Sequence, residues 1–335
     1  MEEIRMKKRI IAGLSLVALT AAMTSAVSAA DYTIAVVVKG NTNGWFVRME
    51  QGIKEYAEAT GIKAYMTGPS DTDSAQQIQI LQDVISQQPD AICVVPIDPA
   101  ACENVLKEAM EMGIKVICHE GSNLQNCDYD VEAFDNAGYG AFIMDNLAEL
   151  MGEEGEYITM VGYLTSASNN EWADGAVARA DEAYPNLTLA AEKRLESENS
   201  AEKAYEVAKE YLKKNANIKG FTGSSSDDTP GVARAINELG LKDKVFVVGT
   251  GMPNECRNLL KDGSLQLITL WDPAQAGYAM CELARKVLDG EEIGEGTDLG
   301  LPGYDSLKVD ANNPKVLMGD ASIAISAENV DEYDF

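Results

Sequence analysis

Side chains that carry out catalysis are scarce in this sequence. His119 is the only histidine among the 335 residues, so His-based metal sites and Ser-His-Asp triads are effectively excluded. The first strand-to-helix turn, KGNTNG, lacks the GxGxxG spacing of dinucleotide-binding turns, and no P-loop or CxxC pair occurs. We therefore expect a protein that is not an enzyme and that uses no cofactor or metal ion.

One enzymatic alternative stays open, because glycosidase chemistry needs only two acids that face each other across a cleft. Paired carboxylates such as Asp227 and Asp228 occur, but these two are adjacent in the sequence. In a chain this acidic, adjacent carboxylates more often belong to a solvated loop, which is the interpretation that we favour for them. An exported hydrolase on an α/β scaffold is the corresponding alternative function.

The remaining polar and aromatic residues are suited to binding a small polyol. An aromatic surface packs against the C–H face of a sugar ring, while amides, hydroxyls and carboxylates bond its hydroxyl groups. All three tryptophans of the chain follow predicted strands. The expected ligand-binding residues are Lys39, Asn43, Trp45, Phe46, Asp98, Glu120, Ser168, Asn169, Asn170, Trp172, Ser224, Ser226, Trp271 and Asp272.

Within this set, the side chains have different expected roles. Trp45, Phe46 and Trp172 are expected to stack on the ring of the ligand. The hydroxyl-bonding residues are expected to be Lys39, Glu120, Asn169, Asn170, Ser224 and Asp272. His119 is interpreted as a structural hydrogen-bonding residue.

Strand and helix patterns alternate along the chain and would position these side chains. Residues 32–38 form a nearly continuous apolar, β-branched run, as in a strand covered on both faces. Further strands are predicted at 63–67, 91–96, 115–118, 128–134, 157–162, 187–194, 218–222, 245–249 and 265–269. The predicted helices are 46–60, 74–87, 99–112, 138–151, 171–184, 201–215, 230–239, 254–262 and 274–289.

Two such βαβ series predict an α/β protein with two doubly wound parallel-sheet lobes joined by a three-strand hinge. The N-terminal lobe is expected to contain residues 31–134 and 273–302, and the C-terminal lobe residues 135–272 and 303–335. In open α/β sheets, ligands bind at the carboxyl ends of the strands. The binding residues of both lobes are therefore expected to face one shared cleft.

Residues 1–30 have the pattern of a secretory signal peptide, with four basic residues before a short apolar segment and small residues at its end. No cysteine lies at the cleavage junction, so the mature protein is expected to be periplasmic and without a lipid anchor. It would keep 23 basic and 52 acidic residues, a net charge of −29. That charge repels nucleic acid, and we expect a monomer.

Six cysteines are too few for a disulfide scaffold. Cys93 and Cys118 lie inside predicted strands and are expected to be buried thiols. Cys102 and Cys127 each follow a neighbouring strand, so they are a candidate disulfide pair.

Three segments together resemble the type I periplasmic sugar-binding proteins of ABC importers. They are VVVKGNTNGWFVRMEQGIKEYAEATG, PDAICVVPIDPAA and LWDPAQAGYAM. The chain is most similar to the autoinducer-2-binding and rhamnose-binding branch, through Lys39, VGTGMPN, LWD and the ending NVDEYDF. The resemblance implies ligand contacts from Lys39 and Glu120. It also implies delivery of a sugar-like ligand to a membrane permease.

The second lobe departs from the autoinducer-2 binders. Where they carry Asp-Gln and Pro-x-Ala, this chain has Ser168-Asn169 and Ser224-Ser225-Ser226. A monosaccharide is therefore the expected ligand. The alternative within the same fold is a signal receptor of the autoinducer-2 type that serves uptake or chemotaxis.

Overall fold

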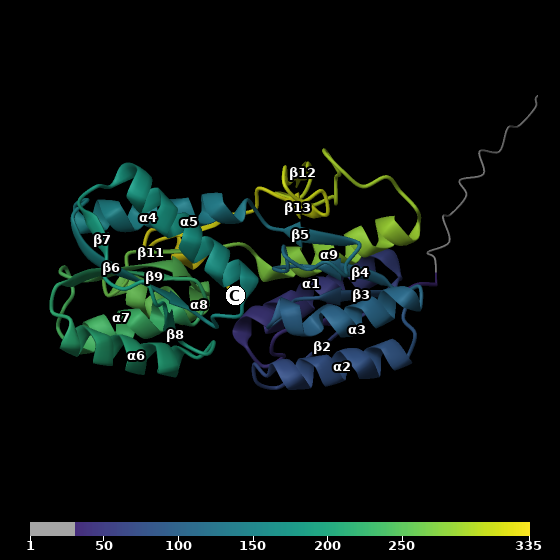
Figure 1. Cartoon of the computed structure of the whole chain (residues 1–335), viewed down its shortest axis with the longest axis horizontal. Coiled ribbons are helices and arrows are strands. Elements are labelled where there is room, and N and C mark those ends of the chain that lie inside the picture. The colour runs from purple at the N-terminus through teal and green to yellow at the C-terminus, as the bar shows by residue number, and fades with distance from the viewer. Residues whose placement is uncertain (1–30) are drawn as a thin grey trace, which may run out of the picture.

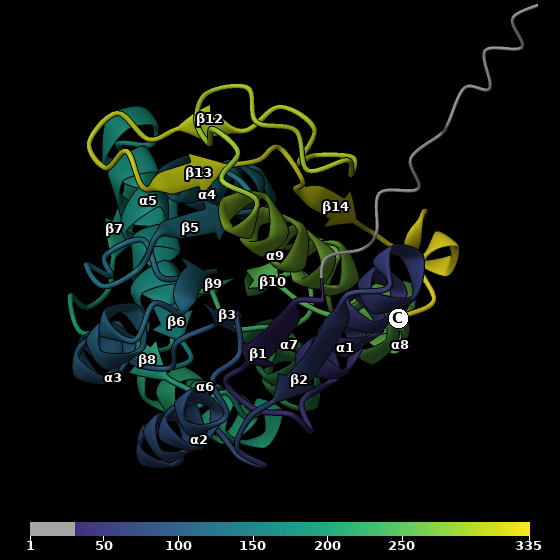
Figure 2. The same ribbon diagram turned by 90° about the vertical axis from the view of Figure 1, so that its right-hand side faces the viewer.

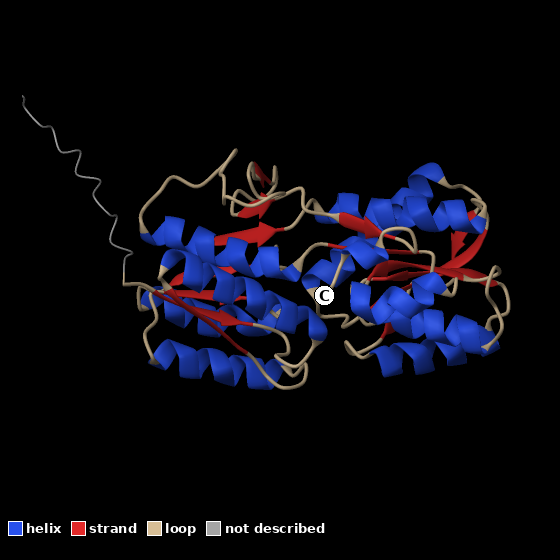
Figure 3. Ribbon diagram, turned by 180° about the vertical axis from the view of Figure 1, so that it is seen from behind, coloured by secondary structure: helices blue, strands red, loops and turns tan. Residues whose placement is uncertain are grey.

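The computed structural model describes residues 31–335, which form two lobes side by side (Figure 1). The predicted signal peptide, residues 1–30, lies outside the described residues. Each lobe is built on one mostly parallel sheet with helices on both faces (Figure 3). The predicted architecture of two doubly wound α/β lobes is therefore confirmed.

The sheet of the first lobe has the strand order β12-β13-β5-β4-β3-β1-β2, and only β12 runs antiparallel to its neighbour. Its strands are β1 (Thr33–Val37), β2 (Lys63–Thr67), β3 (Ala91–Val94), β4 (Lys115–Cys118), β5 (Tyr129–Glu132), β12 (Lys308–Val309) and β13 (Val316–Met318). Its helices are α1 (Gly44–Thr60), α2 (Ser74–Ser86), α3 (Pro99–Glu111) and α9 (Pro273–Leu288).

Strand β1 shows why these residues form a buried parallel strand. Side chains of a strand alternate between the two faces of its sheet. Ile34 and Val36 pack in the core with α1 and α9, whereas Ala35 and Val37 pack in a separate core with α2 and α3. Figure 2 shows where these four helices lie around β1, β2 and β3. Because both faces are covered, the strand is apolar throughout, as the sequence predicted.

The sheet of the second lobe has the order β14-β11-β10-β9-β6-β7, with β8 also paired to β6. Its strands are β6 (Gly155–Val161), β7 (Leu187–Leu189), β8 (Leu195–Glu196), β9 (Ile218–Gly223), β10 (Phe246–Thr250), β11 (Leu267–Leu270) and β14 (Ile323–Ile325). Its helices are α4 (Asn136–Met151), α5 (Ala167–Ala183), α6 (Ala201–Lys214), α7 (Asp228–Glu238) and α8 (Pro253–Lys261), followed by the short 3₁₀ helix η1 (Val330–Glu332).

The described chain passes between the two sheets three times: from β5 to α4, from β11 to α9, and from β13 to β14. The first and third passages are hydrogen-bonded to each other. Gly319 N donates to Glu132 O and Ala321 N donates to Ala133 O, both at 2.9 Å. These passages correspond to the three hinge segments that the sequence predicted.

Two boundaries expected from the sequence differ from the structure. The sequence predicts that residues 303–335 belong to the second lobe, but β12 and β13 are part of the first sheet, because Leu317 pairs with Val131 of β5. Only β14 and the residues after it join the second lobe. The strand predicted at 187–194 is confined to β7, which ends at Leu189, and the separate strand β8 begins at Leu195; the two pair with different parts of β6.

No helix among residues 31–335 is long and apolar enough to cross a membrane.

Helices α4 and α5 approach so closely that a side chain is excluded at their contact. A Cβ atom added at Gly140 would lie 2.1 Å from the carbonyl oxygen of Trp172. We expect Gly140→Ala to lower the free energy of unfolding by about 1–3 kcal/mol, because the helices must move apart. Urea denaturation followed by circular dichroism measures this change.

Gly294 provides the matched control, since a Cβ there would meet no atom within 4 Å. Gly294→Ala is expected to change stability by no more than about 1 kcal/mol. Equal effects of the two substitutions would contradict the packing argument.

Candidate ligand-binding cleft

A cleft lies between the lobes where the carboxyl ends of β1 and β4 face those of β9 and β10. Its cavity measures about 40 Å³, which is room for a few water molecules. The cleft is lined by Lys39, Asn43, Trp45, Phe46, Thr72, Glu120, Asn169, Trp172, Asn199, Ser224, Ser225, Ser226, Asp227, Thr250 and Trp271.

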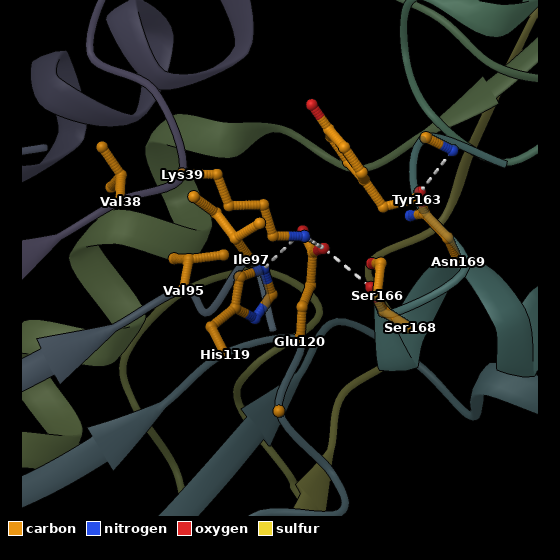
Figure 4. Close-up of polar contacts among 12 residues, drawn as sticks. Val38, Lys39, Val95, Ile97, His119, Glu120, Tyr163, Ser166, Ser168 and Asn169 are labelled. Atoms are coloured by element: carbon orange, nitrogen blue, oxygen red, sulfur yellow. Dashed lines mark hydrogen bonds and ion pairs between the residues drawn. The ribbon is translucent and has the colours of Figure 1, made fainter. Parts of the chain in front are cut away.

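A buried ion pair joins Lys39 and Glu120, which follow β1 and β4 of the first lobe. Lys39 Nζ lies 2.5 Å from Glu120 Oε2, and the two residues are only 6% and 5% exposed. Ser168 of the second lobe donates to the same carboxylate oxygen at 2.8 Å (Figure 4). Two donors, one from each lobe, thus meet at one oxygen atom of Glu120.

The charge state of Glu120 follows from this arrangement. Burial alone favours the neutral carboxyl, but the nearby Lys39 and His119 and the hydrogen bond from Ser168 together hold the pKa of Glu120 below its usual range. The backbone of Glu120 has a φ of 58°, which is uncommon for a residue with a side chain. Such strain costs about 1–3 kcal/mol and is often retained at functional sites.

A second polar contact crosses the cleft and joins Asn43 of the first lobe to Asp227 of the second. Asn43 begins α1, because its Oδ1 accepts from Trp45 N at 2.8 Å. Its Nδ2 donates across the cleft to Asp227 Oδ2 at 3.1 Å. Burial raises the pKa of Asp227 to about 6, although this hydrogen bond acts in the opposite direction.

An aromatic cluster forms the floor of the cleft around Trp271. The Trp45 and Trp172 rings lie edge-on to it, with centroid distances of 4.6 and 5.4 Å. The indole Nε1 atoms of Trp45 and Trp271 are buried, and the structure shows no hydrogen-bond partner for either within residues 31–335. The cleft therefore combines apolar ring surfaces with amides and hydroxyls.

The single histidine has a structural environment. His119 is buried, and its Nδ1 lies 2.6 Å from the carbonyl oxygen of Val131. Burial lowers its pKa below the ordinary value. This geometry agrees with the expected structural hydrogen bond.

The loop before α7 differs from the sequence interpretation. Asp228 is fully buried. Its Oδ2 accepts hydrogen bonds from the backbone N–H groups of Ser224 at 3.0 Å and Ser225 at 2.8 Å. Asp227 lines the cleft. The two acids are thus not a solvated loop.

Ten of the fourteen predicted residues line the cleft, and their role in binding stays a prediction. Ser168 lies behind the lining and bonds Glu120. The other three are structural: Asp98 begins α3, Asn170 donates to the carbonyl groups of Tyr163, Leu164 and Ser166, and Asp272 begins α9 and pairs with Arg48 at 2.7 Å. In all three, a short polar side chain at the start of a helix forms hydrogen bonds with backbone groups.

Five residues of the lining are outside the expected ligand-binding set: Thr72, Asn199, Ser225, Asp227 and Thr250. Thr250 ends β10, and Ser225 and Asp227 follow β9, so position after a strand was a usable signal for them. Thr72 and Asn199 enter from loops. No sequence pattern marks them.

The candidate disulfide is contradicted by the structure. All six cysteines are free and buried. Cys102 Sγ lies 4.0 Å from Gln77 Oε1, whereas Cys127 Sγ donates to Leu124 O at 3.6 Å. Cys93 and Cys118 are buried thiols, as predicted.

No group of three or more His, Cys, Asp or Glu side chains within residues 31–335 is arranged to hold a metal ion.

Two lobes that enclose a small polar and aromatic cleft define a solute-binding protein. The family model described as periplasmic binding protein domain matches residues 34–292. The D-allose-binding periplasmic protein of Escherichia coli (strain K12) is 30% identical over 284 residues, which cover 81% of this chain and 88% of that protein. The chain therefore belongs to the periplasmic binding protein family, and the prediction that it is not an enzyme is confirmed.

A further relative and two solved structures are also similar to this chain. The ribose import binding protein RbsB of Bacillus subtilis (strain 168) is 24% identical, over 78% of this chain and 84% of that protein. LsrB from Clostridium saccharobutylicum in complex with AI-2 has a TM-score of 0.82 at 22% identity, covering 90% of this chain and 100% of that one. A solute-binding protein from Clostridium phytofermentas with bound L-rhamnose has a TM-score of 0.83 at 22% identity, covering 90% and 98%. The two structures share the fold.

The raised pKa of Asp227 predicts a pH effect on stability. Between an unfolded pKa of about 4 and the folded pKa of about 6, the unfolded chain loses the proton first, so stability falls as pH rises. The Asp227→Asn variant has no carboxyl at this position, so its stability does not fall in this way as the pH rises. Relative to the wild type, we expect the variant to gain about 1–3 kcal/mol in the free energy of unfolding between pH 4 and pH 7.

Urea denaturation at several pH values measures this difference between the two proteins. Asp71→Asn, an exposed acid on a loop, is the control and should show no such gain. A constant difference between wild type and Asp227→Asn across the pH range would contradict the assignment.

Proposed function

We propose that this chain is the substrate-binding protein of an ABC transporter, which binds a monosaccharide in the interlobe cleft and delivers it to a membrane permease. The observation that carries the proposal is the lining of the cleft, where aromatic rings of both lobes lie beside amides and hydroxyls. That combination suits the C–H faces and hydroxyl groups of a sugar. The names of the allose- and ribose-binding relatives support it.

The charges of the cleft favour a neutral ligand. Among the described residues of the lining, Lys39 is the only cation, and Glu120 already neutralises it. Asp227 adds a carboxyl whose burial disfavours its charge. An anionic ligand would meet no free cation among these cleft residues of the described chain, whereas a polyol bonds to either form of these groups.

Ligand contacts from both lobes explain how binding and closure are coupled. Asn43 and Trp45 come from the first lobe, and Asn169, Ser224 and Ser226 from the second. A ligand that touches both sets binds the closed state better than the open one and so shifts the population toward it. A permease that recognises the closed arrangement would then receive loaded protein.

The expected setting of this function rests on the sequence. Residues 1–30 support export, and the lack of a cysteine at the cleavage junction supports a mature protein without a lipid anchor. The net charge of −29 disfavours nucleic acid as a partner. Action as a monomer remains part of the proposal.

A second candidate is a signal receptor of the autoinducer-2 type. Lys39 and Glu120, the two residues that the sequence resemblance implies for that branch, lie together in the cleft. The second-lobe residues differ from that pattern, so we favour the monosaccharide.

A thermal-shift screen tests the two ligands directly. A ligand at about 100 times its dissociation constant adds about 2.7 kcal/mol of stability. We expect stabilisation by at least one aldopentose, aldohexose or deoxyhexose. Stabilisation by autoinducer-2 alone would select the receptor, and no response to either class would contradict the proposal.

Lys39 gives a sharper test once a sugar is known. A hydrogen bond from a charged group contributes about 1.5–3 kcal/mol, so we expect Lys39→Met to weaken the affinity at least about tenfold by calorimetry. Asp98→Asn keeps the start of α3 and lies outside the cleft lining, so its affinity should stay unchanged. Equal affinities in both variants, with intact circular dichroism, would refute the assignment of Lys39.

A further inference from the structure

Glu120 lies in a sharp turn directly after β4, and the residues on both sides of it are bonded to β5. Its φ of 58° lies in the left-handed region, which a residue with a long side chain rarely adopts. Such a conformation persists only where the surrounding structure holds it. Contacts from outside the turn must therefore fix the backbone of Glu120.

His119 anchors the turn on the N-terminal side of Glu120. Its Nδ1 lies 2.6 Å from the carbonyl oxygen of Val131 in β5. A carbonyl oxygen can only accept, so Nδ1 carries the hydrogen and donates it. Burial lowers the pKa of the imidazole, which favours the neutral ring with its single hydrogen at this position.

Asp130 anchors the turn on the C-terminal side. It is 1% exposed, and its Oδ1 accepts from Gly121 N at 3.1 Å. The neighbouring carboxyl of Glu132 is neutral, because burial raises its pKa well above the usual range, and it donates a hydrogen bond to Asp130. Asp130 is thus the acceptor in both contacts, and the residues before and after Glu120 are both held on β5.

The position of this turn determines the contacts of the Glu120 carboxylate. Its Oε2 accepts from Lys39 Nζ at 2.5 Å and from Ser168 Oγ at 2.8 Å. Figure 4 shows His119 beside this contact. Both hydrogen bonds are short, so a displacement of the turn would lengthen them and weaken the link between the lobes.

We propose that His119 and Asp130 are positioning residues of the ligand-binding cleft, which act by holding Glu120 in its left-handed conformation. The described lining of the cleft includes Glu120 but neither of these two residues, so each acts through the Glu120 carboxylate. The inference rests on the proposed function, because the placement of this carboxylate matters for affinity only if the cleft binds a sugar. It also assigns a role to the single histidine of the chain.

Two substitutions of His119 separate this role from packing alone. The imidazole ring also lies edge-on to Trp271, with centroids 5.9 Å apart. His119→Phe keeps a ring and removes the donor, whereas His119→Asn removes the ring and places an amide donor close to the position of Nδ1. If the histidine only fills space, His119→Phe is the milder change. If it anchors the turn, His119→Asn is the milder change.

The pKa of Glu120 in the sugar-free mature protein is the first measurement, made by NMR on ¹³C-labelled glutamate. Burial raises this pKa, whereas the contacts with Lys39 and Ser168 lower it, so a displaced carboxylate has a higher pKa. Both variants lack the imidazole near the carboxylate, so the comparison between them isolates the anchoring bond. We expect a higher pKa of Glu120 in His119→Phe than in His119→Asn.

Sugar affinity by calorimetry is the second measurement, with a monosaccharide that stabilises the wild type in a thermal-shift screen. We expect His119→Phe to bind this sugar at least about tenfold more weakly than His119→Asn, because hydrogen bonds of a charged group are lost. If no sugar binds to the wild type, the proposed function fails, and the pKa comparison still decides whether His119 positions Glu120.

Three results would overturn the inference. They are equal pKa values of Glu120 in the two variants, a higher pKa in His119→Asn, and equal sugar affinities. Urea denaturation shows whether each variant is folded. If a variant of His119 does not fold, Asp130→Leu and Asp130→Asn take the place of the pair. Asparagine keeps an acceptor for Gly121 N and leucine has none, so the pKa of Glu120 should be higher in Asp130→Leu.

Discussion

The buried ion pair of Lys39 and Glu120 is the interaction on which the cleft depends. Removing two charges from water costs several kcal/mol per ion, and attraction repays that cost only with good geometry and further hydrogen bonds. Both partners extend from strands of the first lobe, but Ser168, the additional donor, belongs to the second. Closure therefore excludes water from the pair and at the same time completes its hydrogen bonding.

The aromatic cluster around Trp271 places a second constraint on the same region. Trp271 directly follows β11, at one of the passages between the lobes, and packs against Trp45 of the first lobe and Trp172 of the second. A movement of the lobes must therefore change the contacts of these rings. The hinge and the floor of the cleft are thus built from the same residues, which couples the shape of the site to the angle between the lobes.

The sequence predicted most of the fold because burial on both faces leaves a plain pattern. β1 and β2 belong to strands recognised from their residues, whereas the two-residue and three-residue strands β12 and β13 carry too few side chains to form a pattern, and only their pairing with β5 defines them. The cleft residues likewise include some that a sequence pattern marks and some that none marks. Lys39 and Trp45 follow a strand directly, but Asn199 reaches the cleft from a loop whose path depends on the packing of the whole lobe.

The position of β13 has a consequence for how the molecule acquires its structure. This strand completes the first sheet beside β5, yet it lies near the end of the chain, at Val316–Met318. The first lobe cannot complete its sheet until the second-lobe residues that precede β13 have been made, although most of its own residues come earlier in the chain. The contacts between β13 and β5 therefore join residues that are far apart in the sequence, and contacts of this kind slow folding. Any condition that delays the making of β13 therefore also delays the completion of the first sheet.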